Sequence, residues 1–163
     1  MLKNRLLIGL IVMCSAFAAC EKPEVYNVDE HYAIDEEKIL NWAEVTDTEL
    51  IKHESGLYYH IDTAGDGTMP LEFTDTLVVQ YVGKLLTDSI IAETTETLPY
   101  TFVLGNGIPG WKLGLPMIRE KGTVRLLIPS TLAYRDQTVG LVPPNSPLDF
   151  RIYIKEVRKK KEK

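Results

Sequence analysis

The chain has 163 residues, 45% of them hydrophobic and 25% charged, and its 18 basic and 23 acidic side chains give a formal net charge of −5. This length allows one hydrophobic core plus an extension. The acidic balance argues against a nucleic-acid partner, because proteins that bind nucleic acids need basic faces.

Residues 1–19 have the order of residues found in a secretory signal peptide. Lys3 and Arg5 precede an apolar run at 6–13, and small residues then lead to Cys20. The run is shorter than the roughly 20 residues that a membrane-spanning helix needs. We therefore expect cleavage after residue 19, with a retained membrane anchor as the alternative.

The order Ala-Ala-Cys at 18–20 resembles the lipobox of bacterial lipoproteins. The resemblance implies lipidation of Cys20 and a membrane-anchored protein of the bacterial cell envelope, at the outer membrane. Phe17 stands where an aliphatic residue is usual, which leaves a chance cysteine as the alternative. The remaining cysteine, Cys14, lies in the segment to be removed, so the mature domain must be stabilised by its core rather than by a disulfide.

Residues 20–55 are predicted to form an acidic tether and a short helix. Within 21–55 there are eleven carboxylates, three lysines and no glycine, which separates this stretch from the rest of the chain. Asp35 is a suitable N-cap for a helix over 36–43, whose first turn is acidic as the helix dipole favours.

One face of this predicted helix is apolar and carries Ile39, Trp42 and Ala43. We expect it to pack on the domain that follows. Self-association through the helix at 35–43 is the alternative, since exposed apolar stripes mark interfaces.

From Gly56 the apolar residues follow a period of two, which predicts β-strands. The alternation recurs at 57–62, 76–85, 100–104, 124–128 and 148–155. In the last of these runs the inward positions are Leu148, Phe150, Ile152 and Ile154, and the outward ones are Asp149, Arg151, Tyr153 and Lys155. The pattern predicts an antiparallel sheet with one face exposed to water.

The stretch 109–118 is the only candidate helix among these strands, and Pro116 limits it to about two turns because proline removes a donor and clashes with the preceding turn. The predicted fold class is α+β, with a bent antiparallel β-sheet (a half-barrel) wrapped over one short helix and a short helical extension before it.

Several chemical motifs are excluded by their context. Residues 105–110 match Gly-x-Gly-x-x-Gly, but the long crossover helix and parallel strands of a dinucleotide site are missing. The three histidines, His31, His53 and His60, precede the main strands and lack metal-ligand spacing. A serine or cysteine nucleophile would also lack a histidine base. No cofactor and no metal are implied.

What remains is a group of aromatic residues from five separate predicted elements, namely Tyr81, Tyr100, Trp111, Tyr134 and Phe150. An arbitrary group of this kind is more often a core than a pocket. Their order along the chain is more specific. The segments around them are Gly65-Asp66-Gly67, 78–86, 99–105, Ile108-Pro109-Gly110-Trp111, 122–129, Leu132-Ala133-Tyr134 and 141–148.

These segments resemble, in order, the signatures of the FKBP-type peptidyl-prolyl isomerase family. The resemblance covers a domain at 56–157, which leaves 158–163 as a basic tail. The acidic helix before the domain is similar to extensions of lipid-anchored members of this family.

The resemblance implies a peptidyl-prolyl cis-trans isomerase that assists the folding of exported proteins and takes proline-containing polypeptide segments as partners. Trp111 would be the floor of the proline pocket, and Tyr134 would donate its hydroxyl to a substrate carbonyl. Tyr81, Tyr100 and Phe150 would be the walls, and the further apolar lining would be Ile91, Ile108, Leu141 and Val142.

Three features depart from the family pattern. Ile91-Ala92 replaces the usual Phe-Asp, the loop 105–108 is about two residues shorter, and Arg135 stands where glycine is common. These departures leave a catalytically weak or inactive peptide-binding or chaperone module as the alternative function.

Overall fold

The computed structural model describes residues 26–70, 72–87, 89–93 and 98–160. The predicted signal peptide at 1–19 and the predicted lipidation site Cys20 lie outside the described residues, as do the last three positions of the basic tail. Among the residues that are described, no helix is long and apolar enough to cross a membrane.

The described part of the chain forms one sheet of seven strands, all paired antiparallel, in the order β1-β2-β6-β7-β3-β4 with β5 paired to β3. The strands are β1 (Ile51–Lys52), β2 (Tyr58–Thr63), β3 (Thr76–Leu85), β4 (Ile90–Glu93), β5 (Tyr100–Val103), β6 (Thr123–Ile128) and β7 (Leu148–Arg158). Register shifts in the β2·β6, β3·β7 and β3·β4 pairs are of the kind that bends strands.

The inner face of the sheet is covered by α2 (Pro109–Gly114), which continues into the 3₁₀ helix η2 (Leu115–Met117). Pro109 at the first helical position begins α2, and Pro116 lies in the 3₁₀ turn after it. The main core lies between this helix and the strands, and includes Leu77, Val79, Leu115, Val124, Leu126, Ile152 and Ile154. The predicted α+β class, an antiparallel sheet over one short helix, is confirmed.

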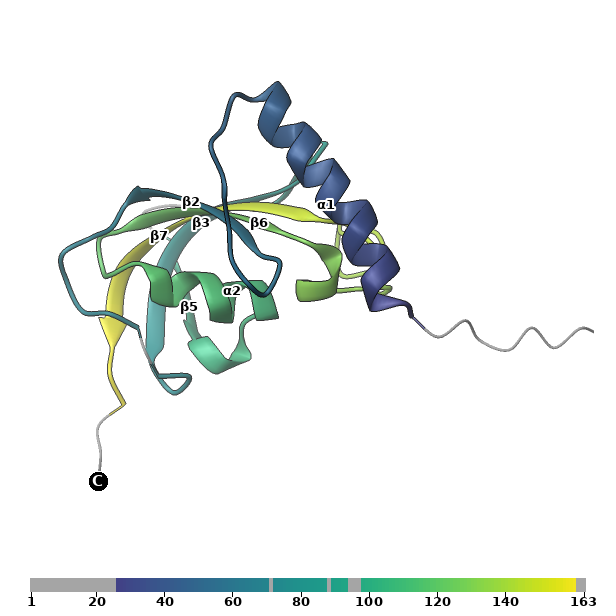
Figure 1. Ribbon diagram of the computed structural model, residues 1–163. Coiled ribbons are helices and arrows are strands. Elements are labelled where there is room, and N and C mark those ends of the chain that lie inside the picture. Colours follow the sequence, from purple (N-terminus) through teal and green to yellow (C-terminus); the bar gives the residue numbers. More distant parts are fainter. Residues whose placement is uncertain (1–25, 71, 88, 94–97, 161–163) are drawn as a thin grey trace, which may run out of the picture.

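The outer face carries α1 (Val28–Val45), so that the sheet lies between α1 and α2 (Figure 1). The helix predicted at 36–43 is present, but the prediction that Asp35 caps its start is wrong, because α1 begins at Val28. Asn27 caps α1 instead by accepting a hydrogen bond from the Glu30 amide at 3.3 Å, and acidic residues follow in the first turn. Asp35 is inside the helix and only 1% exposed.

The apolar face of α1 packs on the domain, as expected. Ile39 and Trp42 form a second, smaller core with Tyr58 of β2 and Leu127 of β6, and Ala43 packs against it. The side chains of β2 therefore serve two cores, because alternate residues of a strand point to opposite faces of the sheet.

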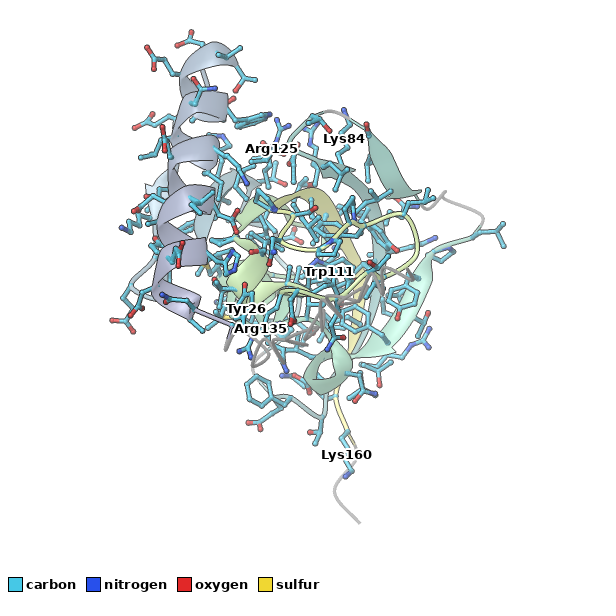
Figure 2. The ribbon with its side chains drawn as sticks, turned by 90° about the vertical axis from the view of Figure 1, so that its right-hand side faces the viewer. Tyr26, Lys84, Trp111, Arg125, Arg135 and Lys160 are labelled. Carbon is cyan, nitrogen blue, oxygen red and sulfur yellow. The ribbon has the colours of Figure 1, made fainter. Side chains whose placement is uncertain are left out.

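The expectation that the outer face is exposed to water is wrong where α1 covers it. Asp149, an outward position of β7, is 3% exposed. Its carboxylate accepts hydrogen bonds from Arg125 Nε at 2.9 Å and from Arg125 Nη2 at 2.6 Å. The Arg125 guanidinium also lies 4.4 Å from the ring centroid of Trp42, between the sheet and α1 (Figure 2).

Two further 3₁₀ helices follow strands of the sheet, and neither is predicted by the sequence. They are η1 (Leu104–Asn106), which follows β5, and η3 (Ser130–Leu132), which follows β6. Each is only three residues long, too short to produce a helical periodicity. The strand β1 escaped prediction because it is only two residues long. The strand β4 escaped it because Ile90, Ile91 and Ala92 are consecutive apolar residues that do not alternate with polar ones.

Candidate functional site

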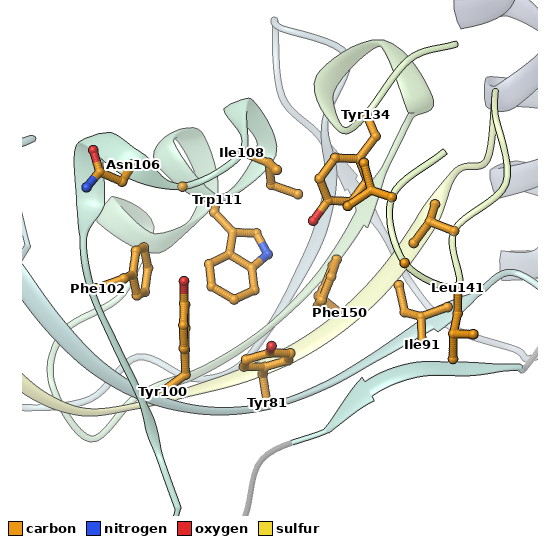
Figure 3. A pocket seen from close by; sticks show the side chains of 14 residues that line it. Tyr81, Ile91, Tyr100, Phe102, Asn106, Ile108, Trp111, Tyr134, Leu141 and Phe150 are labelled. Atoms are coloured by element: carbon orange, nitrogen blue, oxygen red, sulfur yellow. The ribbon is translucent and has the colours of Figure 1, made fainter. Parts of the chain in front are cut away.

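A pocket opens on the inner face of the sheet, at the N-terminal end of α2. Trp111 of α2 is its centre, and four other aromatic rings surround the indole: Tyr81 of β3, Tyr100 and Phe102 of β5, and Phe150 of β7 (Figure 3). The Trp111 centroid lies 5.1 Å from that of Tyr81, 5.2 Å from those of Phe102 and Phe150, and 6.4 Å from that of Tyr100.

The geometry of these rings follows the edge-to-face preference of aromatic pairs. The indole plane is inclined at 77° to Tyr81 and 87° to Phe150, whereas Tyr100 and Phe102 stack at 15°. Such pairs add roughly 0.5–1.5 kcal/mol each beyond the area they bury. The rings therefore hold one another in place without a bound partner.

Trp111 is placed by the first turn of α2. Its amide donates to the Ile108 carbonyl at 3.0 Å, and Gly110 beside it packs directly on Ile128 of β6. The indole Nε1 is buried and has no hydrogen-bond acceptor among the described residues. A buried donor without an acceptor costs about 1–3 kcal/mol. The indole at the floor of the pocket therefore offers an apolar surface together with one N–H that a bound acceptor could satisfy.

The pocket also contains tyrosine hydroxyls. Tyr134 follows η3, and its hydroxyl points toward the side of the pocket near Trp111 and Phe150 (Figure 3). This hydroxyl forms no hydrogen bond with another residue of the described chain. Burial raises the pKa of Tyr134, with a further contribution from Tyr100.

The second hydroxyl that the pocket holds in its neutral form is that of Tyr81. Burial is the main cause that raises the pKa of Tyr81, followed by Tyr100 and Tyr134. At neutral pH the hydroxyls of Tyr81 and Tyr134 are both protonated, as tyrosine hydroxyls ordinarily are, and the raised pKa keeps this neutral form to higher pH.

The rim of the pocket is built by the loop at 139–142 and by β4. Val139 and Val142 exchange two backbone hydrogen bonds, at 3.1 and 2.9 Å, which form a tight reversal. Val142 is 5% exposed and faces inward, whereas Leu141 at the tip is 72% exposed. Ile91 of β4 completes this side.

The nine side chains singled out from the sequence come together around one cavity of about 420 Å³. These are Tyr81, Ile91, Tyr100, Ile108, Trp111, Tyr134, Leu141, Val142 and Phe150. Their roles in substrate binding remain a prediction. The lining also includes Phe102, Asn106, Gly107, Val139 and Gly140, which were not singled out. Phe102 could have been found, since it shares a strand face with Tyr100.

Among the described residues that line the pocket, none carries a carboxylate, an imidazole or an amine. Elsewhere in the described ranges, no three His, Cys, Asp or Glu side chains are grouped so as to hold a metal ion. The site can therefore offer an apolar well and neutral hydrogen-bond donors. That chemistry suits a ring-shaped apolar side chain next to an amide.

The model of the family of FKBP-type peptidyl-prolyl cis-trans isomerases matches residues 67–155, and the chain belongs to this family. A probable FKBP-type peptidyl-prolyl cis-trans isomerase of Haemophilus influenzae is 37% identical over 112 residues, which are 68% of this chain and 46% of the relative. The isomerase FkpA of Escherichia coli K12 is 38% identical over 105 residues, which are 64% of this chain and 38% of the relative.

Outer membrane protein MIP of Legionella longbeachae is 37% identical over 108 residues, 64% of this chain and 46% of that protein. The chain thus spans less than half the length of these curated relatives.

Solved structures show the same similarity. The crystal structure of FkpA from E. coli matches with a TM-score of 0.69 at 34% identity, over 80% of this chain and 62% of that one. A peptidyl-prolyl cis-trans isomerase from Pseudomonas syringae matches with a TM-score of 0.68 at 25% identity, over 82% of this chain and 97% of that one. The second match extends over nearly the whole of a solved protein.

Proposed function

We propose that this protein is a peptidyl-prolyl cis-trans isomerase that acts on proline-containing polypeptide segments. The observation that carries the proposal is the well with Trp111 as its floor and the rings of Tyr81, Tyr100, Phe102 and Phe150 around it. Its aromatic and apolar lining suits a proline ring, and membership of the family supports the same activity.

Isomerisation of an Xaa-Pro bond has to overcome a barrier of about 20 kcal/mol, which arises from amide resonance. The planar amide is polar and is stabilised by water, whereas the twisted amide loses that resonance. A dry well that holds the proline ring removes solvent from the planar form, and binding that is strongest for the twisted form lowers the barrier. No covalent step is required.

In this mechanism Trp111 supports the proline ring and Tyr134 donates its hydroxyl to a carbonyl of the substrate. This donor is protonated at neutral pH, and burial raises the pKa of Tyr134 further above that range. Ile108 also contributes an apolar side chain at the entrance to α2.

The proposed setting is the bacterial cell envelope, where the domain assists the folding of exported proteins from a lipid anchor on Cys20. The signal-peptide pattern before Cys20 supports export, and the similarity to a protein named for the outer membrane supports the location. The acidic stretch after Cys20 then serves as the tether between the lipid and α1.

The function is tested by NMR exchange spectroscopy of an Xaa-Pro peptide with the purified protein. We expect the wild type to accelerate exchange and Tyr134→Phe to lower kcat/KM roughly five- to tenfold, because one hydrogen bond contributes about 1 kcal/mol. Tyr153→Phe is the matched control, since Tyr153 lies on the opposite face of the sheet from the pocket and should leave the rate unchanged. A wild-type rate equal to that in buffer would end the proposal.

A second candidate function is a non-catalytic peptide-binding module or chaperone. It is favoured by Ile91-Ala92 in place of the usual Phe-Asp and by exposed apolar side chains at the rim, with Leu141 72% and Tyr100 46% exposed. Suppression of aggregation of a proline-free client, together with a gain of isomerase activity in Ala92→Asp, would support it. Substantial activity that Ala92→Asp leaves unchanged, with no effect on aggregation, would exclude it.

A further inference from the structure

Asp35 is a buried carboxylate on α1 with a partner far away in the sequence. Its side chain is 2% exposed, and Oδ2 accepts a hydrogen bond from the Ser130 amide at 2.7 Å, across 95 residues of chain. The other oxygen, Oδ1, lies 3.4 Å from Nζ of Lys38, a side chain that is 49% exposed. The short buried contact to Ser130 is thus the stronger of the two.

Ser130 is the first residue of η3, and the position before it is Pro129. A proline side chain cannot accept a hydrogen bond, and η3 has no side-chain cap of its own. The first amides of a helix have no partner within that helix. Asp35 therefore caps η3 from another element, as Asn or Asp does at the start of a helix.

The segment that carries Tyr134 is attached to Ser130. The Ser130 carbonyl accepts the amides of Ala133 at 3.0 Å and of Arg135 at 2.9 Å, so the residues on both sides of Tyr134 are bonded to it. The Arg135 carbonyl in turn accepts the Asn145 amide at 2.6 Å, which continues the connection toward the rim loop.

A second contact reaches Ser130 from the start of α1. The Tyr26 hydroxyl lies 3.4 Å from Ser130 Oγ, and the Tyr26 ring stacks on His31 at 4.5 Å between centroids. Figure 2 labels Tyr26 at this end of the helix. The N-terminal helix thus holds the backbone that presents Tyr134.

We propose that Asp35 is a positioning residue for the isomerase pocket. By capping η3 at Ser130, Asp35 fixes the orientation of the Tyr134 hydroxyl. The packing of α1 on the outer face of the sheet therefore affects the isomerase rate of the pocket on the inner face. This inference rests on the proposed isomerase function and on the role given there to Tyr134.

The test is a double-mutant cycle in peptide exchange with the full chain. We expect Asp35→Ala to lower kcat about five- to tenfold with little change in KM, because the well that binds the proline ring stays intact. In the Tyr134→Phe background, Asp35→Ala should have no further effect. Asp35→Asn keeps an acceptor oxygen of the same shape and should restore most of the wild-type activity.

Two controls separate positioning from loss of stability. Lys38→Ala removes the weaker partner of Asp35 and should leave the rate unchanged. Val157→Ala removes a core side chain near the end of β7, whereas Phe150 of the pocket lies near its start. This variant should lower the melting temperature and leave kcat unchanged. If the double variant loses kcat by the product of the two single losses, Asp35 and Tyr134 act independently, and the proposal is overturned.

Hydrogen exchange of the backbone gives a readout that does not depend on activity. We expect the amides of 133–137 to exchange at least tenfold faster in Asp35→Ala, while amides of β7 keep their protection. Unchanged exchange at 133–137 in a folded variant would overturn the connection between α1 and Tyr134. If the wild type has no isomerase activity, the proposed function fails, and the effect of Asp35 on activity fails with it. The hydrogen-exchange data would still decide whether Asp35 holds the segment that carries Tyr134.

Discussion

At the scale of single residues, Glu36 of α1 is a point where three side chains meet. Its Oε1 accepts hydrogen bonds from Tyr58 at 2.6 Å, Lys52 at 2.7 Å and Tyr32 at 3.1 Å. Hydrogen bonds from Lys52 and then Tyr58 lower the pKa of Glu36. Burial and the Glu36 carboxylate raise the pKa of Tyr58 to about 12. The carboxylate thereby joins α1 to β1 and β2.

The lowered pKa makes this stabilisation depend on pH. It is present above the ordinary pKa of 4.5 and is lost as the pH falls through the lower pKa of the folded state. We expect Glu36→Gln to reduce the free energy of unfolding by about 1 kcal/mol at neutral pH, with a difference from wild type that shrinks as the pH falls below 4.5. Chemical denaturation over this pH range measures it. The exposed Glu37→Gln serves as control, and a difference that stays constant with pH would contradict the argument.

At the scale of elements, α2 can lie close to the sheet because two glycines one turn apart face β6. A Cβ atom at Gly110 would come within 2.5 Å of Ile128, and one at Gly114 within 2.5 Å of Leu126. Real Cβ atoms do not approach other side chains so closely, so the absence of a side chain sets the distance between helix and sheet. That distance also sets the depth of Trp111 in the well.

We therefore expect Gly114→Ala to destabilise the protein, although alanine is the better helix former by about 1 kcal/mol. Forcing a methyl group against Leu126 should cost about 1–3 kcal/mol. Thermal unfolding gives the comparison, with Lys112→Ala on the same helix as the control that stays within about 0.5 kcal/mol of wild type. A Gly114→Ala variant more stable than wild type would show that α2 has room to move.

At the scale of the whole molecule, the sheet separates two cores. The main core and the pocket lie on the α2 side, and the smaller core of Ile39, Trp42, Tyr58 and Leu127 lies under α1. Arg125 is the polar connection on the α1 side, since it pairs with the buried Asp149 and stacks on Trp42.

Removal of this arginine should leave a buried carboxylate without its charge partner. We expect Arg125→Met to lower the free energy of unfolding by about 3 kcal/mol. Arg151, its neighbour across β6 and β7, pairs with Asp62 at 2.9 Å but is 66% exposed. Arg151→Met should therefore cost less than about 1 kcal/mol. Urea denaturation followed by circular dichroism measures both, and equal losses would refute the role of burial.

Much of the fold could be predicted from the sequence because a long run of alternating apolar and polar residues fits a β-strand with one buried face and no other regular structure. The runs at 76–85 and 148–155 correspond to β3 and to most of β7. Elements without an alternating run could not be found in this way, since β1 is two residues long and β4 begins with three consecutive apolar residues. The start of α1 was placed too late because Asn27 is an equally good cap that lies further upstream.

The candidate site was reached by a different route. Periodicity marked Tyr81, Tyr100 and Phe150 only as buried or half-buried positions, which fits a core as well as a pocket. The resemblance in the order of motifs selected them as pocket residues, whereas Phe102 was not singled out although it shares a strand face with Tyr100.

The sequence by itself determined the alternation of the strands, the one short helix between them and the family signatures, because these depend on residues close together in the chain. Only the tertiary structure decided what Asp35 does. A carboxylate near a predicted helix start looks like a cap for that helix, yet Asp35 caps η3, 95 residues away, because α1 begins earlier and docks beside Ser130. Such a contact depends on packing between distant segments, which no local pattern records.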